Sequence, residues 1–137
     1  RYQYVATLDA RTSSICQRLD GQLFRYDQGP VPPQHFNCRS TTVPVIDDDD
    51  LARAFPNTRP SATGRVPQDT NYATWLKDNP DLQDKVLGKK KRYFNYLMSP
   101  KRGTKQLNAT NALKKIIRED GSELTLKELA AKYKDAN

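Results

Sequence analysis

The sequence predicts an α+β fold, in which a small antiparallel β unit over residues 1–46 precedes a helical part over 70–137. Three observations lead to this prediction. Aromatic and β-branched residues gather near the amino terminus, and apolar residues recur at helical spacing after residue 70. An acidic, proline-rich stretch over 47–69 separates these two regions. With 137 residues, the chain is long enough for one ordinary domain, or for one small domain with an appendage.

Two runs in the first region are strand candidates. Residues 2–8 contain aromatic and β-branched side chains in partial alternation, which favours a strand. Residues 39–46 form the second candidate, and Pro44 places it at the edge of a sheet because proline cannot donate a ladder hydrogen bond. Between the two runs, Asp20-Gly21 is a strong turn signal. These features predict a small antiparallel unit.

The stretch over 47–69 is predicted to be an extended linker. It begins with four consecutive aspartates, Asp47 to Asp50, which repel one another. Prolines and small polar residues follow, so little of the segment can be buried to offset its ordering entropy. We therefore expect it to lack regular structure and to wrap over the body of the protein.

The region over 70–137 is predicted to be helical. Apolar residues recur at helical spacing from Tyr72 onward, with Asp69 or Thr70 as the first cap. Pro80 suits the first turn of a second helix. Thr125 and Glu128 form a capping-box pattern that opens a last helix. The side chains expected on the apolar faces are Trp75, Leu76, Leu82, Val86, Leu87, Tyr93, Phe94, Leu97, Met98, Leu107, Leu113, Ile116, Ile117, Leu126, Leu129, Ala130 and Tyr133.

Composition excludes several classes of protein. Apolar residues make up 36% of the chain and the mean hydropathy is −0.88, which indicates a small core. No apolar run approaches the roughly 20 residues that a membrane-spanning helix needs, so we expect no membrane partner. Two cysteines and one histidine are too few for a disulfide scaffold or an iron–sulfur ferredoxin.

Positive charge is concentrated in one segment. The net charge is +7, but residues 85–118 contain 11 lysines and arginines and no acidic residue, whereas the segments on either side each carry −2. This asymmetry indicates an anionic partner such as the phosphate backbone of DNA; the alternative is a solvated, lysine-rich helix face. The residues expected to contact the polyanion are Lys89, Lys90, Lys91, Arg92, Lys101, Arg102 and Lys105.

The spacing of His35 and Cys38 is that of a zinc knuckle, which predicts a metal site. Cys16 is the only other cysteine, and the position three residues before it is Ser13, a poor zinc ligand. Asp9, the nearest acidic residue, or a water molecule would complete the ligand set. Two other interpretations stay open. Cys16 and Cys38 can be small buried apolar residues, or they can form a disulfide. In each case we expect Asp9, Cys16, His35, Cys38 and Arg39 to converge, with Arg39 paired to Asp9.

A catalytic interpretation uses the same region. His35 would move a proton and Arg39 would hold a phosphate, as in acid–base cleavage of RNA by a small basic nuclease or a toxin-like effector. A single histidine without an evident acid–base partner is weak support for this chemistry. We therefore expect no catalytic residues and a structural role.

The first region also carries an ordered set of short motifs. Residues 4–16 contain Asp-x-Arg-Thr and, after it, a cysteine; Asp20-Gly21 follows; and residues 32–39 read Pro-Pro-x-His-x-x-Cys-Arg. In this order they resemble the head-morphogenesis family of tailed phages, the Mu F-like minor head proteins. Residues 59–129 are similar to the later part of that family, with the poorest likeness over 93–118. Many relatives carry Cys-x-x-Cys where this chain has Ser13-x-x-Cys16.

The resemblance implies a minor capsid protein of a double-stranded DNA phage that acts structurally in head assembly, portal association or DNA packaging and delivery. The implied partners are portal or capsid proteins, and the implied locations are the head interior and, during assembly, the host cytoplasm. The resemblance concerns the C-terminal part of such proteins. Because the chain starts at Arg1 within a strand-like run, we expect it to be a piece of a longer protein.

Overall fold

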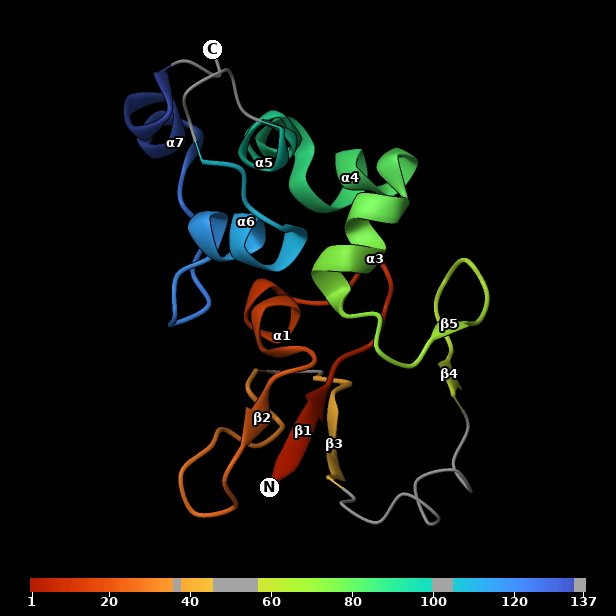
Figure 1. Cartoon of the computed structure of the whole chain (residues 1–137). Coiled ribbons are helices and arrows are strands. Elements are labelled where there is room, and N and C mark those ends of the chain that lie inside the picture. Colours follow the sequence, from red (N-terminus) through yellow and green to blue (C-terminus); the bar gives the residue numbers. More distant parts are fainter. Residues whose placement is uncertain (36–37, 46–56, 100–104, 135–137) are drawn as a thin grey trace.

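The fold is described by a computed structural model that covers residues 1–35, 38–45, 57–99 and 105–134. A small antiparallel sheet lies at one end of the molecule, and the helices of the second half gather at the other end (Figure 1). Helix α1 (Ser14–Leu19) lies between the sheet and these helices. The predicted α+β class is therefore confirmed.

The sheet has three strands in the order β2-β1-β3. Strand β1 (Tyr2–Val5) is central and pairs antiparallel with both β2 (Leu23–Phe24) and β3 (Thr41–Pro44). Pro44 stands opposite Tyr2 on an edge strand, as predicted. Burial alternates along β1 and continues beyond it, so that one face of this segment supplies buried side chains from Tyr2, Tyr4, Ala6 and Leu8.

Helix α1 was not predicted, because the sequence indicated only strands and a turn in the first 46 residues. Its six residues are too few to show a helical period and too few to be stable alone. Contacts from distant parts of the chain hold it instead. Arg18 donates hydrogen bonds to the main-chain oxygens of Lys114 and Ile117 at the end of a later helix.

The described end of the expected linker is also more regular than predicted. Strands β4 (Thr58–Arg59) and β5 (Val66–Pro67) form a short antiparallel hairpin. The main-chain N–H of Ala62 in its loop donates to the oxygen of Leu8 at 2.9 Å, which ties the hairpin to the first region. The four aspartates from Asp47 to Asp50 lie outside the described residues.

The second half contains five α-helices and one short 3-10 helix among the described residues. They are α3 (Tyr72–Asp78), α4 (Pro80–Leu87), η1 (Gly88–Lys90), α5 (Lys91–Met98), α6 (Ala109–Ile116) and α7 (Leu126–Lys132). Pro80 begins α4, and the capping box between Thr125 and Glu128 forms, both as predicted. The cap of α3 differs: Asn71, and not Asp69 or Thr70, accepts the hydrogen bond from the N–H of Thr74.

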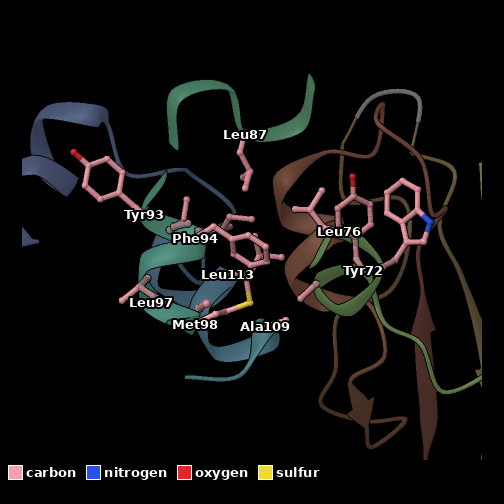
Figure 2. Packing of buried hydrophobic residues seen from close by; sticks show 14 of the residues in the cluster. Tyr72, Leu76, Leu87, Tyr93, Phe94, Leu97, Met98, Ala109 and Leu113 are labelled. Atoms are coloured by element: carbon pink, nitrogen blue, oxygen red, sulfur yellow. The ribbon is translucent and has the colours of Figure 1, made fainter. Parts of the chain in front are cut away.

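The main core lies among these helices. Figure 2 shows Phe94, Met98 and Leu113 close together where α5 meets α6, with Leu87 above them and Leu76 on α3 beyond. Leu8 from the first region belongs to the same cluster, so sheet and helices share one core. Leu126 is 38% exposed, contrary to prediction, because the seven-residue α7 directs Leu129 inward instead.

A buried ion pair joins the two halves. The side chain of Asp20 is fully buried and that of Arg59 is 8% exposed, and their nearest charged atoms are 3.1 Å apart. Asp20 also accepts hydrogen bonds from the main-chain N–H groups of Ala6 at 2.8 Å and Tyr72 at 2.7 Å. Arg59 donates to the oxygens of Ala6 and Thr70. One carboxylate therefore connects the segment after β1, the hairpin and the start of α3.

Within the described residues, none of the helices has both the length and the apolar character needed to cross a lipid bilayer.

Candidate functional site

Three side chains of the types that can bind a metal ion meet beside the sheet. Cys16 lies in α1 and is 1% exposed, and Cys38 lies just before β3. The two Sγ atoms are 3.7 Å apart, and Nε2 of His35 lies 3.3 Å from Sγ of Cys16. All three ligand atoms lie within 4.8 Å of one another. The convergence predicted for these three residues is confirmed, and we refer to them as the Cys/His cluster.

Local packing brings the loop over 25–35 back to α1. An added Cβ at Gly29 would lie 2.2 Å from Oη of Tyr2 and 2.3 Å from Cβ of Phe24, so only glycine fits there. The hydroxyl of Tyr2 donates to the oxygen of Pro30 at 2.5 Å. The N–H of Cys38 then donates to the oxygen of His35 at 3.3 Å, which closes a turn between the two ligands. These contacts place His35 and Cys38 next to Cys16 on α1.

Tyr4 lies directly against the two sulfurs. Its hydroxyl oxygen is 3.4 Å from Sγ of Cys16 and 4.0 Å from Sγ of Cys38. Burial raises the pKa of Tyr4, so its hydroxyl stays protonated and is able to donate to a thiolate. The sequence analysis missed Tyr4 as a site residue, although the alternation along 2–8 was the signal that places it on the buried face.

The Cys38 sulfur sits in an environment that favours the thiolate. Burial by itself raises the pKa of Cys38, but hydrogen bonds from the backbone at Gln34 and Ser40, and from Cys16, outweigh it and lower that pKa to about 6. Thiolates, and not thiols, are the form that binds metal ions.

Asp9 does not belong to the cluster. Arg39 holds it in a two-pronged ion pair, with Nη1 to Oδ2 at 2.6 Å and Nη2 to Oδ1 at 2.9 Å. The pairing predicted between these two residues is confirmed. The hydrogen bond from Arg39 is the main reason that the pKa of Asp9 falls to about 2. As a metal ligand Asp9 was a wrong choice, because its oxygens are committed to Arg39 and it lies outside the ligand group.

A small cavity of about 20 Å³ opens beside the cluster. Its lining includes Cys16, His35 and Ser13. The Ser13 hydroxyl is buried without a hydrogen-bond partner among the described residues. Ser13 occupies the position three residues before Cys16, where a second cysteine would complete a Cys-x-x-Cys motif.

The catalytic interpretation finds little support in this geometry. Nε2 of His35 faces Sγ of Cys16 at 3.3 Å, and the Arg39 guanidinium is held by Asp9. A phosphate-binding arginine would need its donors free for the substrate. His35 and Arg39 line the same cavity, but His35 contacts Cys16 and Arg39 pairs with Asp9.

The predicted basic residues do not form one uniform set. Lys91 pairs with Asp84 at 2.6 Å and Lys90 with Glu123 at 3.9 Å, so two of the seven have acidic neighbours that lie outside 85–118. Lys89, Arg92 and Lys105 are exposed. The guanidinium of Arg92 lies 5.7 Å from the ring centre of Tyr93. Lys101 and Arg102 lie outside the described residues.

Comparison with known proteins relates part of this chain to phages. Residues 1–43 match the family described as Phage Mu protein F like protein. The matched range holds β1, α1, β2 and the whole Cys/His cluster. The match lies at the amino-terminal end of this chain and not over its C-terminal part, so the similarity expected over 59–129 has no counterpart in it.

One curated relative is also similar. An uncharacterized protein of Haemophilus influenzae is 30% identical over 93 residues, which cover 64% of this chain and 20% of the relative. The chain therefore spans about a fifth of the length of that relative. No solved structure matches this chain.

Proposed function

We propose that this protein is a minor head protein of a tailed, double-stranded DNA phage and acts structurally during head assembly. The observation that carries the proposal is the match of residues 1–43 to the Phage Mu protein F like family. Those residues also form a defined structural unit, with a sheet, a helix and a side-chain cluster. A structural role is consistent with a site in which His35 faces Cys16 and Arg39 pairs with Asp9.

The partners follow from the same proposal. Portal or capsid proteins would be the protein partners, and packaged DNA would lie near the basic segment 85–118. Contacts of Lys89, Arg92 and Lys105 with phosphate groups would be independent of base sequence. The proposed location is the head interior, with the host cytoplasm during assembly.

The test is the composition of phage particles. We would induce a phage that encodes the full-length gene, purify DNA-filled heads and search for peptides of this chain by mass spectrometry. Peptides in the heads, together with loss of infective particles after in-frame deletion, support the proposal. Absence from heads, with normal infective particles after deletion, would overturn it.

The nuclease alternative receives its own test. Purified protein would be incubated with RNA and DNA, with and without a chelator. We expect no cleavage. Cleavage that disappears in His35→Ala but persists in Gln34→Ala would replace the structural role with an enzymatic one.

A further inference from the structure

The cavity beside the Cys/His cluster contains an unsatisfied group. A buried hydroxyl without a partner costs about 1–3 kcal/mol, so such groups are rare unless a water or an ion accounts for them. The Ser13 hydroxyl is in this situation among the described residues, and Ser13 is one of the residues that line the same cavity as Cys16 and His35. A volume of about 20 Å³ exceeds the 10–15 Å³ that one water requires.

The two separations from Cys16 Sγ to the other ligand atoms fit a tetrahedral metal ion, and all three ligand atoms lie within 4.8 Å of one another. Zinc–sulfur bonds of about 2.3 Å and zinc–nitrogen bonds of about 2.0 Å place two sulfurs about 3.8 Å apart and a sulfur and a nitrogen about 3.5 Å apart. The corresponding separations here are 3.7 Å between the sulfurs and 3.3 Å between Cys16 Sγ and His35 Nε2. A disulfide would require the sulfurs at about 2.05 Å, nearly half the observed distance.

The surroundings complete the chemistry of such a site. The Tyr4 hydroxyl reaches the ligand sulfurs as a hydrogen-bond donor, the type of support that orients metal ligands. Two thiolates neutralise a divalent ion, and the nearby Arg39 is already neutralised by Asp9. The site therefore needs no further charged side chain to balance a divalent ion.

We propose that Cys16, His35 and Cys38 bind one Zn²⁺ ion and that the fourth coordination position faces the cavity at Ser13. Water, or the Ser13 hydroxyl itself, fills this position. The site differs from a closed structural zinc centre, which has four protein ligands. The ion links α1 to the segment that leads into β3 and thereby fixes the edge of the sheet.

The first test is the metal content of untagged protein purified under reducing conditions in the presence of zinc. We expect about one equivalent of zinc by mass spectrometry and protection of both thiols from a thiol reagent until a chelator is added. Cobalt exchanged into the site should give the visible bands of a tetrahedral ion and a thiolate charge-transfer band. A zinc content below about a tenth of an equivalent, with two freely reacting thiols, overturns the proposal. So does a Cys16–Cys38 disulfide in its place.

Variants separate a metal site from a merely structural cluster. Tyr4→Phe should lower the zinc affinity about 10- to 100-fold, because it removes the donor to the thiolates. Tyr72→Phe is the matched control, since its buried hydroxyl donates at 2.6 Å to the oxygen of Asp9 and not to a sulfur. Equal zinc affinities of the two variants would contradict the proposed role of Tyr4. These measurements use competition with a chelator and do not depend on the stability of a cysteine variant.

The fourth position is tested at Ser13. Ser13→Cys restores a Cys-x-x-Cys motif and should slow the loss of zinc to a chelator, while its cobalt spectrum should show an additional thiolate. Ser13→Ala should retain about one equivalent, because water fills the position. Unchanged zinc retention and an unchanged cobalt spectrum in Ser13→Cys would show that the fourth position does not face this residue.

Discussion

Arg59 is almost entirely buried, and its guanidinium is held by hydrogen bonds to Asp20, Ala6 and Thr70. It neutralises Asp20 and also donates to main-chain oxygens at two separate points of the chain. Burial raises the pKa of Asp20, and Arg59 opposes that shift. Removing the arginine therefore leaves a carboxylate that is both desolvated and unpaired.

We expect Arg59→Leu to lower the free energy of unfolding by about 3–5 kcal/mol, as found when one partner of a buried ion pair is removed. Arg65→Leu is the control in the same hairpin, because Arg65 is exposed and its hydrogen bonds within the described residues go to Thr58. Arg65→Leu should lower the free energy of unfolding by less than about 1 kcal/mol. The measurement is urea denaturation at neutral pH, and similar losses in both variants would contradict this account of Arg59.

Asp9 gives a pH-dependent prediction. Its pKa is about 2 in the folded protein, below the usual 3.8 of an aspartate, so its ion pair stabilises the fold above about pH 4 and this contribution is lost as pH falls through 2. Because Arg39 is 39% exposed, we expect the pair to contribute about 1 kcal/mol. In urea denaturation, Asp9→Asn should show this deficit at pH 7 and a much smaller one near pH 2.

The control for Asp9 is Asp27→Asn, which alters an exposed ion pair with Arg25. It should change the free energy of unfolding little at either pH. A deficit in Asp9→Asn that is the same at pH 7 and near pH 2 would show that the ion pair is not its cause.

At the scale of elements, local signals predicted some features and failed for others. The capping box of α7 and the proline at the start of α4 depend on neighbouring residues, so sequence alone identifies them. Helix α1 and the β4–β5 hairpin depend on Arg18 and Arg59, which contact residues far away in the chain. No local pattern contains that information.

The turn after α6 contains a testable contact between elements. Gly121 has a φ of +89°, and an added Cβ would lie 2.4 Å from Cβ of Ile15 in α1. Gly64 also has a positive φ, +110°, but no atom of the described residues lies within 4 Å of its Cβ position. Gly64→Ala should therefore cost only backbone strain, about 1 kcal/mol.

Gly121→Ala should cost the same strain and a steric term in addition, for a total of about 2–4 kcal/mol. The difference between the two variants in thermal or urea unfolding isolates the packing of the turn against α1. Equal costs would mean that the turn moves away from α1 without penalty.

At the scale of the whole molecule, the charge distribution predicts salt-dependent DNA binding. Five phosphate contacts would make log K fall with log salt at a slope of about −4 to −5, but Lys90 and Lys91 pair with acidic side chains and are expected to contribute less. With the exposed side chains of Lys89, Arg92 and Lys105 as contacts, the expected slope is about −3. The measurement is a titration of duplex DNA at several salt concentrations.

Two double variants test which lysines contribute. Lys89→Gln with Lys105→Gln removes two exposed charges and should flatten the slope by about 2. Lys90→Gln with Lys91→Gln removes the same charge from lysines that pair with acidic side chains, and should flatten the slope by less than about 1. No DNA binding at low salt, or binding that salt does not alter, would favour an acidic protein surface as the partner of this segment.

The candidate site was partly predictable for a similar reason. The spacing of His35 and Cys38 identified two ligands, and the scarcity of cysteine left only Cys16 as the third. The roles of Tyr4 and Ser13 depend on which side chains meet across the sheet and α1, so they required the structure. The prediction of Asp9 as a metal ligand was wrong because its position near Cys16 in the sequence does not reveal that its carboxylate pairs with Arg39.

The shared carboxylate of Asp20 also limits how such a gene can recombine. The family match ends at residue 43, yet Asp20 is completed by Arg59 and by the main chain at Tyr72. An exchange of genetic material that transfers only residues 1–43 would separate Asp20 from the arginine that neutralises it in this chain. A transferred segment that keeps the ion pair and its main-chain hydrogen bonds together therefore extends to residue 72, beyond the residues that the family model matches.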